Sequence, residues 1–245
     1  SQKLPNSKIN ALHVVNEVIY AGVYRSGIFE SADNGQTWTS LNENLPNQSV
    51  QAILEFKRQL FVGTDAGIFI LDRKNKKWQP TSLKAQTLSI YADRNFLIAG
   101  TSLGTAISKD NGKNWEWIRK EGSTHYTHPI GNPVGNPIGN PIGNPVENSI
   151  VELGLNGDLN FSDNLGKSWR EIYYQPREGS YIYEIIRADN NLLFSNNYGI
   201  HQSVDEGKTW KLIYSTESMA FFDLVTIGST IYGGTRAWDE YRKRE

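Results

Sequence analysis

An eight-residue pattern, Ser-x-Asp-x-Gly-x-Thr-Trp, recurs along this chain and constrains its fold more than any other feature. The pattern occurs at residues 31–38, 108–115, 162–169 and 203–210, with a degenerate copy at residues 71–78. Measured between the tryptophans of successive copies, the spacings are 40, 37, 54 and 41 residues. A period near 40 residues with one long interval predicts a fold built from one recurring supersecondary unit.

Each repeat begins with short β-branched and aromatic runs that are typical of strands. Residues 9–15 and 18–22 flank a polar turn in the first repeat, and residues 50–56 and 60–63 do so in the second. A third strand follows a glycine-containing turn, and the octet then joins it to an outer strand that begins at the tryptophan. Four strands in about 40 residues is the length of one β-propeller blade.

The octet itself has the chemistry of a turn held by its own side chains. Its Asp can accept hydrogen bonds from backbone N–H groups ahead of it, its Gly allows the left-handed conformation, and its Trp can be buried between neighbouring blades. In the degenerate copy, Arg73 stands at the Asp position and Asn75 at the Gly position. The structural residues predicted for the other four copies are Asp33, Gly35, Trp38, Asp110, Gly112, Trp115, Asn164, Gly166, Trp169, Asp205, Gly207 and Trp210.

The octet resembles the Asp-box, or bacterial neuraminidase repeat, of sialidases, xyloglucanases, sortilin-type receptors and a photosystem assembly factor. The resemblance covers nearly the whole chain and implies an all-β fold, a single β-propeller domain over residues 1–245. Five units carry the octet and residues 221–241 form part of a sixth, so we expect six four-stranded blades, the last incomplete or closed by the N-terminus. The resemblance also implies export to the extracellular space or periplasm, with which a chain beginning at Ser1 agrees.

The long interval between octets contains a tetrapeptide repeat of Pro, Ile or Val, Gly and Asn at about residues 129–146. Proline lacks an N–H group and glycine is costly to order, so this insertion is expected to be a string of turns or a loop. It is either a tandem duplication without a role of its own or an arm that covers a ligand or contacts a partner.

Composition excludes several classes of function. With 25 basic and 26 acidic side chains the formal net charge is -1, which predicts no general attraction to nucleic acid or anionic lipid. The absence of cysteine excludes disulfides, thiolate metal sites and cysteine nucleophiles. The longest apolar runs are strand-sized, so no membrane span is predicted, and no motif indicates a cofactor.

Histidines and carboxylates offer only weak signs of catalysis. His125 and His128 lie three apart on a predicted strand, residues 124–128, and therefore point to opposite faces, so we predict no metal site. A sialidase would need an arginine triad, for which Arg25, Arg187 and Arg236 are the candidates. A glycosidase needs two carboxyl groups that flank the scissile bond, and Asp65, Glu184 and Asp223 either supply them or are solvated rim charges.

The loops joining strands two to three and four to one converge on the face opposite the octets, where propellers bind ligands. They and the starts of the first strands supply Tyr24, Arg25, Asp65, Ser102, Leu103, Asn156, Tyr181, Asn197, Tyr198, Phe221, Arg236 and Trp238. The predicted binding residues are Tyr24, Arg25, Tyr198, Arg236, Trp238, His125 and His128.

The sequence favours a non-catalytic binding or assembly module that recognises a protein or glycan through this face. The alternative is a carbohydrate-active enzyme that uses carboxylates in the central funnel. A third hypothesis is a structural piece of an extracellular assembly, contacted through the insertion.

Overall fold

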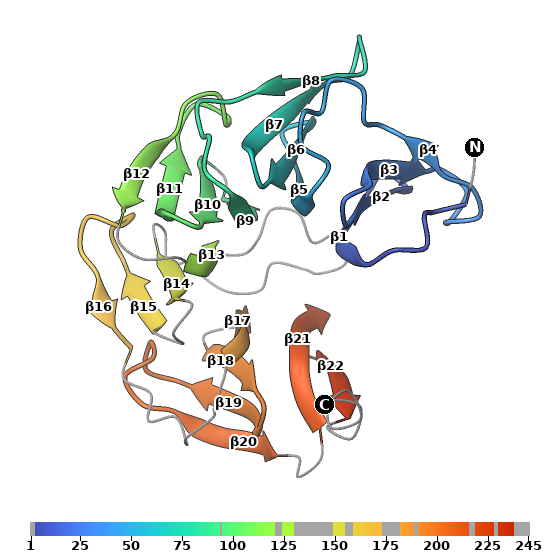
Figure 1. Ribbon diagram of the computed structural model, residues 1–245. Helices are drawn as coiled ribbons and strands as arrows, with labels where there is room; N and C mark the ends of the chain where they lie inside the picture. The colour runs from blue at the N-terminus through green and yellow to red at the C-terminus, as the bar shows by residue number, and fades with distance from the viewer. Residues whose placement is uncertain are drawn as a thin grey trace, which may run out of the picture. The chain divides into compact units, whose positions relative to one another are not determined.

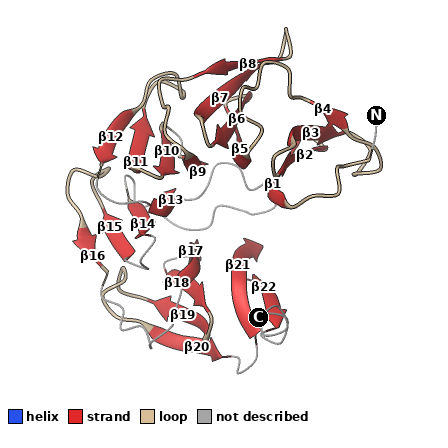
Figure 2. Cartoon of the chain, in the orientation of Figure 1, coloured by secondary structure: helices blue, strands red, loops and turns tan. Residues whose placement is uncertain are grey.

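The computed structural model is all-β, and the residues it describes form strands and turns with no helix (Figures 1 and 2). It describes residues 3–93, 95–120, 124–129, 149–154, 159–172, 182–188, 191–215, 219–227 and 230–237. These fall into two compact units, one containing the described residues up to Pro129 and the other those from Ser149 onward. The prediction of one domain over residues 1–245 stays a prediction. The predicted insertion spans about residues 129–146, and all of it after Pro129 lies outside the described residues.

The first unit contains three four-stranded antiparallel sheets in which the strands follow chain order. The first sheet comprises β1 (Ile9–Val15), β2 (Val18–Val23), β3 (Gly27–Ser31) and β4 (Thr39–Ser40). The second comprises β5 (Val50–Phe56), β6 (Gln59–Thr64), β7 (Gly67–Asp72) and β8 (Lys77–Pro80). The third comprises β9 (Thr87–Ala92), β10 (Leu97–Thr101), β11 (Gly104–Ser108) and β12 (Glu116–Arg119), and is followed by β13 (Thr124–Pro129).

The second unit repeats this organisation. Strand β14 (Ile150–Gly154) pairs with β15 (Leu159–Ser162), which pairs with β16 (Arg170–Glu171). A complete four-stranded sheet follows, comprising β17 (Ile182–Ala188), β18 (Asn191–Asn196), β19 (Gly199–Ser203) and β20 (Lys211–Ser215). The last described sheet has two strands, β21 (Met219–Ile227) and β22 (Thr230–Ala237). Recurring four-stranded antiparallel sheets of this kind are consistent with a β-propeller.

The apolar faces of consecutive sheets pack together. In the first unit, Tyr20, Val50, Phe69 and Trp78 belong to one buried cluster drawn from the first and second sheets. Gly22 makes this packing possible, because a Cβ atom there would lie 2.8 Å from Val50 Cγ1. Gly63 has the same role in the next repeat, where a Cβ atom would lie 2.8 Å from Thr87 Cγ2. Glycine at the end of the second strand therefore lets the next sheet approach closely.

The octet turns share one hydrogen-bond pattern. In the β3–β4 turn, the Ser31 hydroxyl donates to Asp33 (2.8 Å) and accepts from the Gly35 N–H (2.9 Å). Asp33 also accepts from both the N–H (2.8 Å) and the hydroxyl (2.6 Å) of Thr37. These bonds favour the charged carboxylate and lower the pKa of Asp33 to about 2, the Thr37 bonds being the largest cause.

The same contacts recur around Asp110, Asn164 and Asp205. The glycine of each turn has a φ between 77° and 86°, and the residue before it is also left-handed: Asn34, Asn111, Leu165 and Glu206. The sequence pattern shows the need for glycine but gives no sign of the second left-handed residue.

The degenerate turn between β7 and β8 is built differently from its expected alignment with the octet. Its carboxylate is Asp72, one residue before Arg73, and it accepts from the N–H groups of Lys74 (3.0 Å) and Asn75 (3.3 Å). Its left-handed residue is Lys76, with a φ of 52°, rather than Asn75. The turn has therefore kept a carboxylate and lost both the serine and the glycine.

Candidate functional site

The turns between second and third strands lie at one end of the first unit's sheets, and the octet turns lie at the other. This follows from the antiparallel order, in which alternate hairpin turns occupy opposite ends of a sheet. Three such turns, at residues 24–26, 65–66 and 102–103, place predicted binding residues at the end away from the octets. We call this end of the first unit the candidate binding face.

Tyr24 and Arg25 form the β2–β3 turn of this face. Arg25 has a φ of 55°, and its guanidinium carbon lies 5.0 Å from the centroid of the Tyr24 ring. The Tyr24 side chain is 39% exposed, so the stacked pair is presented to solvent. An exposed contact of this kind contributes about 0.5–1 kcal/mol and holds the two groups side by side. Leu103, in the β10–β11 turn, is 51% exposed and adds an apolar contact to the same face.

Asp65, in the β6–β7 turn, faces amides rather than a second carboxylate. Its Oδ1 atom accepts from the side-chain nitrogens of Gln51 (3.3 Å) and Gln86 (2.9 Å). Gln86 belongs to the segment between β8 and β9, so the carboxylate links two successive repeats. The sequence identified Asp65 but missed both glutamines, because they lie 14 and 21 residues from it.

A shallow groove of about 600 Å³ lies beside the Asp65 turn. It is lined by Asn44, Leu45, Pro46, Ala66, Phe69, Trp78, Gln79, Pro80 and Lys84. The Trp78 indole donates to the carbonyl of Leu41, which fixes the ring at the floor. The rim carries the exposed side chains of Gln79 and Lys84. An apolar floor with a few polar groups at the rim suits a peptide or sugar ligand.

In the second unit, Asn196 positions the β18–β19 turn. Its side-chain oxygen accepts from the N–H groups of Tyr198 (2.8 Å) and Gly199 (3.0 Å). Tyr198, one of the predicted binding residues, is half-buried. Glu184 is half-buried on β17, where it stands opposite Ser195 in the strand register.

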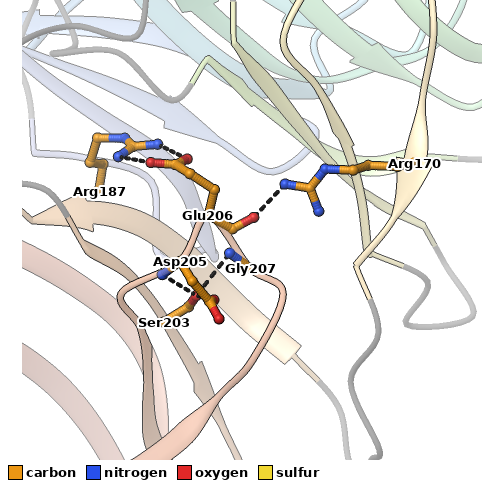
Figure 3. Close-up of polar contacts among 6 residues, drawn as sticks. All are labelled: Arg170, Arg187, Ser203, Asp205, Glu206 and Gly207. Atoms are coloured by element: carbon orange, nitrogen blue, oxygen red, sulfur yellow. Dashed lines mark hydrogen bonds and ion pairs between the residues drawn. The ribbon is translucent and has the colours of Figure 1, made fainter.

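Arg187 is engaged by a protein carboxylate, which argues against its role in a substrate-binding arginine triad. Its two terminal nitrogens donate to Glu206 of the β19–β20 octet at 3.0 and 2.5 Å, and its side chain is only 10% exposed (Figure 3). Arg170 donates to the main-chain carbonyl of the same Glu206 (Figure 3). Arg187 therefore links the first strand of its sheet to the octet turn.

For five further candidates, the structure describes the strand on which each residue lies but not its side chain. His125 and His128 lie on β13, Phe221 and Asp223 on β21, and Arg236 on β22, strands whose backbone alone is described at these positions. Asn156, Tyr181 and Trp238 lie outside the described residues. Within the described part of the chain, no three His, Asp or Glu side chains are grouped as metal ligands. Nor does that part contain a helix long and apolar enough to cross a membrane.

No protein-family model and no curated protein sequence matches this chain. Solved structures do resemble it. YCF48 from Cyanidioschyzon merolae has a TM-score of 0.68 at 15% identity, covering 94% of this chain and 81% of that one. The extracellular domain of BT4673 from B. thetaiotaomicron has a TM-score of 0.70 at 14% identity, and the match spans 96% of this chain but 32% of that one. A GH74 xyloglucanase from Xanthomonas campestris has a TM-score of 0.62 at 15% identity, covering 89% and 40% of the two chains. At these identities the likeness concerns the fold alone.

Proposed function

We propose that this chain is an exported six-bladed β-propeller of the Asp-box type that binds a partner without catalysis. The binding surface is the candidate binding face, and the partner is a protein segment or, as the second choice, a glycan. Five octet-bearing repeats and the β21–β22 pair support the count of six blades. An extracellular domain among the similar structures supports export.

The groove beside Asp65 carries the proposal. It combines the exposed apolar side chains of Pro46 and Pro80, which lie beside the buried Phe69 and Trp78 rings, with the amide of Gln79 and the cation of Lys84, and it is open rather than deep. A peptide or sugar can lie across such a surface, with the exposed Tyr24–Arg25 pair as a further contact on the same face. One similar structure is YCF48 bound to a D1 peptide, which favours a protein segment as the partner.

A glycosidase remains the alternative because a GH74 xyloglucanase shares the fold. The hydrogen bonds of Asp65 favour a structural role for its carboxylate over a catalytic one. Retaining and inverting glycosidases place two carboxyl groups about 5–9 Å apart, whereas Asp65 is flanked by two glutamine amides.

The test is a binding screen against a displayed peptide library and an immobilised glycan panel that includes xyloglucan. We expect ligands that lose at least about tenfold in affinity, or about 1.4 kcal/mol, when Tyr24→Ala and Lys84→Ala are combined. Lys211→Ala, at an exposed lysine of the second unit, is the matched control and should leave affinity unchanged. Ligands indifferent to the double variant would contradict the proposed face. Glycan hydrolysis that Asp65→Asn abolishes would establish the glycosidase instead.

A further inference from the structure

Six basic side chains gather at the octet-turn end of the β5–β8 sheet. Lys57 and Arg58 form the β5–β6 turn, and Arg73, Lys74, Lys76 and Lys77 lie in or beside the β7–β8 turn. The antiparallel order places these two turns at the same end, and the Arg73–Glu55 ion pair at 2.5 Å joins the β7–β8 turn to the last residues of β5. We call these six residues the basic turn patch. It lies at the opposite end of the sheet from Asp65.

The local carboxylates leave some of this charge uncompensated. Arg73 pairs with Glu55, Lys77 lies 3.6 Å from Glu43, and Lys76 is 3.8 Å from Glu30. Asp72 is occupied by the amides of its own turn. Arg58 is exposed and forms no ion pair within the described residues. Lys74 is also exposed, and the carboxylate on which its charge acts, Asp72, is already engaged by the turn amides.

The concentration of charge is particular to this repeat. The β3–β4 octet, residues 31–38, contains no Lys or Arg, whereas residues 71–78 contain four. Lys57, Arg58 and Lys76 also occupy the left-handed region, with φ values of 48°, 65° and 52°. Side chains other than glycine adopt this conformation at an energetic cost. In this copy Leu71 and Asn75 stand at the serine and glycine positions, and four of the eight residues are cations.

The neighbouring surface narrows the class of partner. None of the exposed large hydrophobic side chains among the described residues lies in the β5–β6 or β7–β8 turn, so these turns present no apolar side chain that could insert into a membrane. The ring beneath Lys57 is Phe56, which is 3% exposed and cannot stack on a nucleic-acid base. The patch therefore presents four lysine ammonium groups on flexible stems and two arginine guanidinium groups, and both kinds of cation pair with carboxylates.

We propose that the basic turn patch docks an acidic, Asp- and Glu-rich segment of a partner protein. Arg58 and Lys74 make the primary contacts, and the paired cations add long-range attraction. This site is separate from the candidate binding face, so the chain can contact two partner segments at opposite ends of one sheet.

The test uses a fluorescein-labelled peptide of alternating Asp and Glu, with fluorescence anisotropy as the readout on the whole chain. We expect Arg58→Glu combined with Lys74→Glu to weaken binding at least about tenfold. Raising the salt from about 0.05 M to about 0.2 M should weaken the parent complex as well, because exposed charges are screened. Lys8→Glu combined with Lys211→Glu is the matched control, since it makes the same change in net charge at exposed lysines elsewhere.

Three results would overturn the proposal: equal losses in the two double variants, a parent chain that does not bind the peptide, or tighter binding of a DNA oligonucleotide or anionic vesicles than of the peptide. Near-ultraviolet circular dichroism of each variant checks the fold. Retained peptide binding by the Tyr24→Ala, Lys84→Ala variant separates this site from the candidate binding face.

Discussion

The β7–β8 and β19–β20 turns occupy the same place in their repeats but are held in different ways. The β19–β20 turn has the full octet, with Ser203, Asp205 and Gly207, while the β7–β8 turn relies on Asp72 alone. Each is braced by an ion pair to the first strand of its own sheet, and the polarity is reversed. Glu55 on β5 pairs with Arg73 of the turn, whereas Arg187 on β17 pairs with Glu206.

Although the signs of the charges are exchanged between the two ion pairs, the more buried partner is on the first strand in both. The strand partner is the buried one in both pairs, with 12% exposure for Glu55 and 10% for Arg187, while the turn partners are 45% and 38% exposed. We call each of these ion pairs a brace. In both braces a shielded charge on the first strand pairs with an accessible charge of opposite sign on the turn. The shielded strand position holds a carboxylate in one sheet and a guanidinium in the other.

The largest expected effect comes from removing Glu206, the partner of the shielded Arg187. Glu206→Ala leaves Arg187 shielded and unpaired, and a guanidinium cannot shed its charge, so we expect a loss of about 3 kcal/mol in the free energy of unfolding. Arg73→Ala should cost about 1–2 kcal/mol, because Arg73 donates a single hydrogen bond to Glu55 whereas Arg187 donates two to Glu206. Urea unfolding at neutral pH measures both.

The control for this pair exchanges the charges. Arg187→Glu combined with Glu206→Arg reproduces the β5–β8 polarity in the β17–β20 sheet and should recover at least half of the loss. A cost for Arg73→Ala equal to that of Glu206→Ala would show that the two ion pairs contribute equally, against the expectation that the doubly hydrogen-bonded pair contributes more.

The next effect concerns the left-handed positions. Gly207→Ala places a Cβ atom 3.0 Å from the buried Ile172 at a φ of 80°, and should destabilise the protein by about 1–2 kcal/mol. Lys76→Gly relieves a left-handed lysine in the other turn and should stabilise by about 0.5–1 kcal/mol. Thermal unfolding should move the melting temperatures in opposite directions. A stabilising Gly207→Ala would refute the assignment of strain.

A smaller effect should appear in acid. Hydrogen bonds, those from Thr209 first, lower the pKa of Asp205 from 3.8 to about 2. The carboxylate therefore contributes stability above pH 3.8 that is lost as the pH falls toward 2. Asp205→Asn should flatten this dependence, as Asn164 already occupies the same position in an octet without a charge. If the variant loses as much stability between pH 3.8 and pH 2 as the parent, Asp205 is not the cause of that loss.

The smallest effect belongs to His13, whose Nε2 atom accepts from the N–H of Glu55, the strand partner of the β5–β8 brace, at 3.1 Å. Burial lowers the pKa of His13 below 6.5, partly opposed by the charge of Glu55. The unfolded chain then binds the proton more readily, so stability should fall as the pH drops below 6.5. His13→Gln should remove that slope in urea unfolding between about pH 5 and pH 7.5. A steeper slope in the variant would contradict a neutral His13.

Much of the fold could be predicted because its signals are local. The strands predicted at residues 9–15, 18–22, 50–56 and 60–63 are confirmed as β1, β2, β5 and β6, since β-branched and aromatic runs end at polar turns. The octet contacts join residues two to four apart, as Ser31, Asp33 and Gly35 are, so their spacing is visible in the chain itself.

The candidate site was only partly predictable. The turn positions of Tyr24, Arg25 and Asp65 could be predicted because these residues stand between recognisable strands. The groove could not, because Pro46, Trp78 and Lys84 come from three different segments. The pairing of Arg187 with Glu206 was not predictable either, since nothing near Arg187 in the sequence identifies Glu206 as its partner.

The sequence by itself determined the repeat, the strand positions and the turns that hold their own backbone, because these depend on contacts within a few residues. The tertiary structure decided that Asp72 replaces the octet carboxylate, which polar residues lie on the candidate binding face, and which end of each brace is buried. The brace partners are 18 and 19 residues apart, and only the pairing register of the strands brings them within hydrogen-bonding distance.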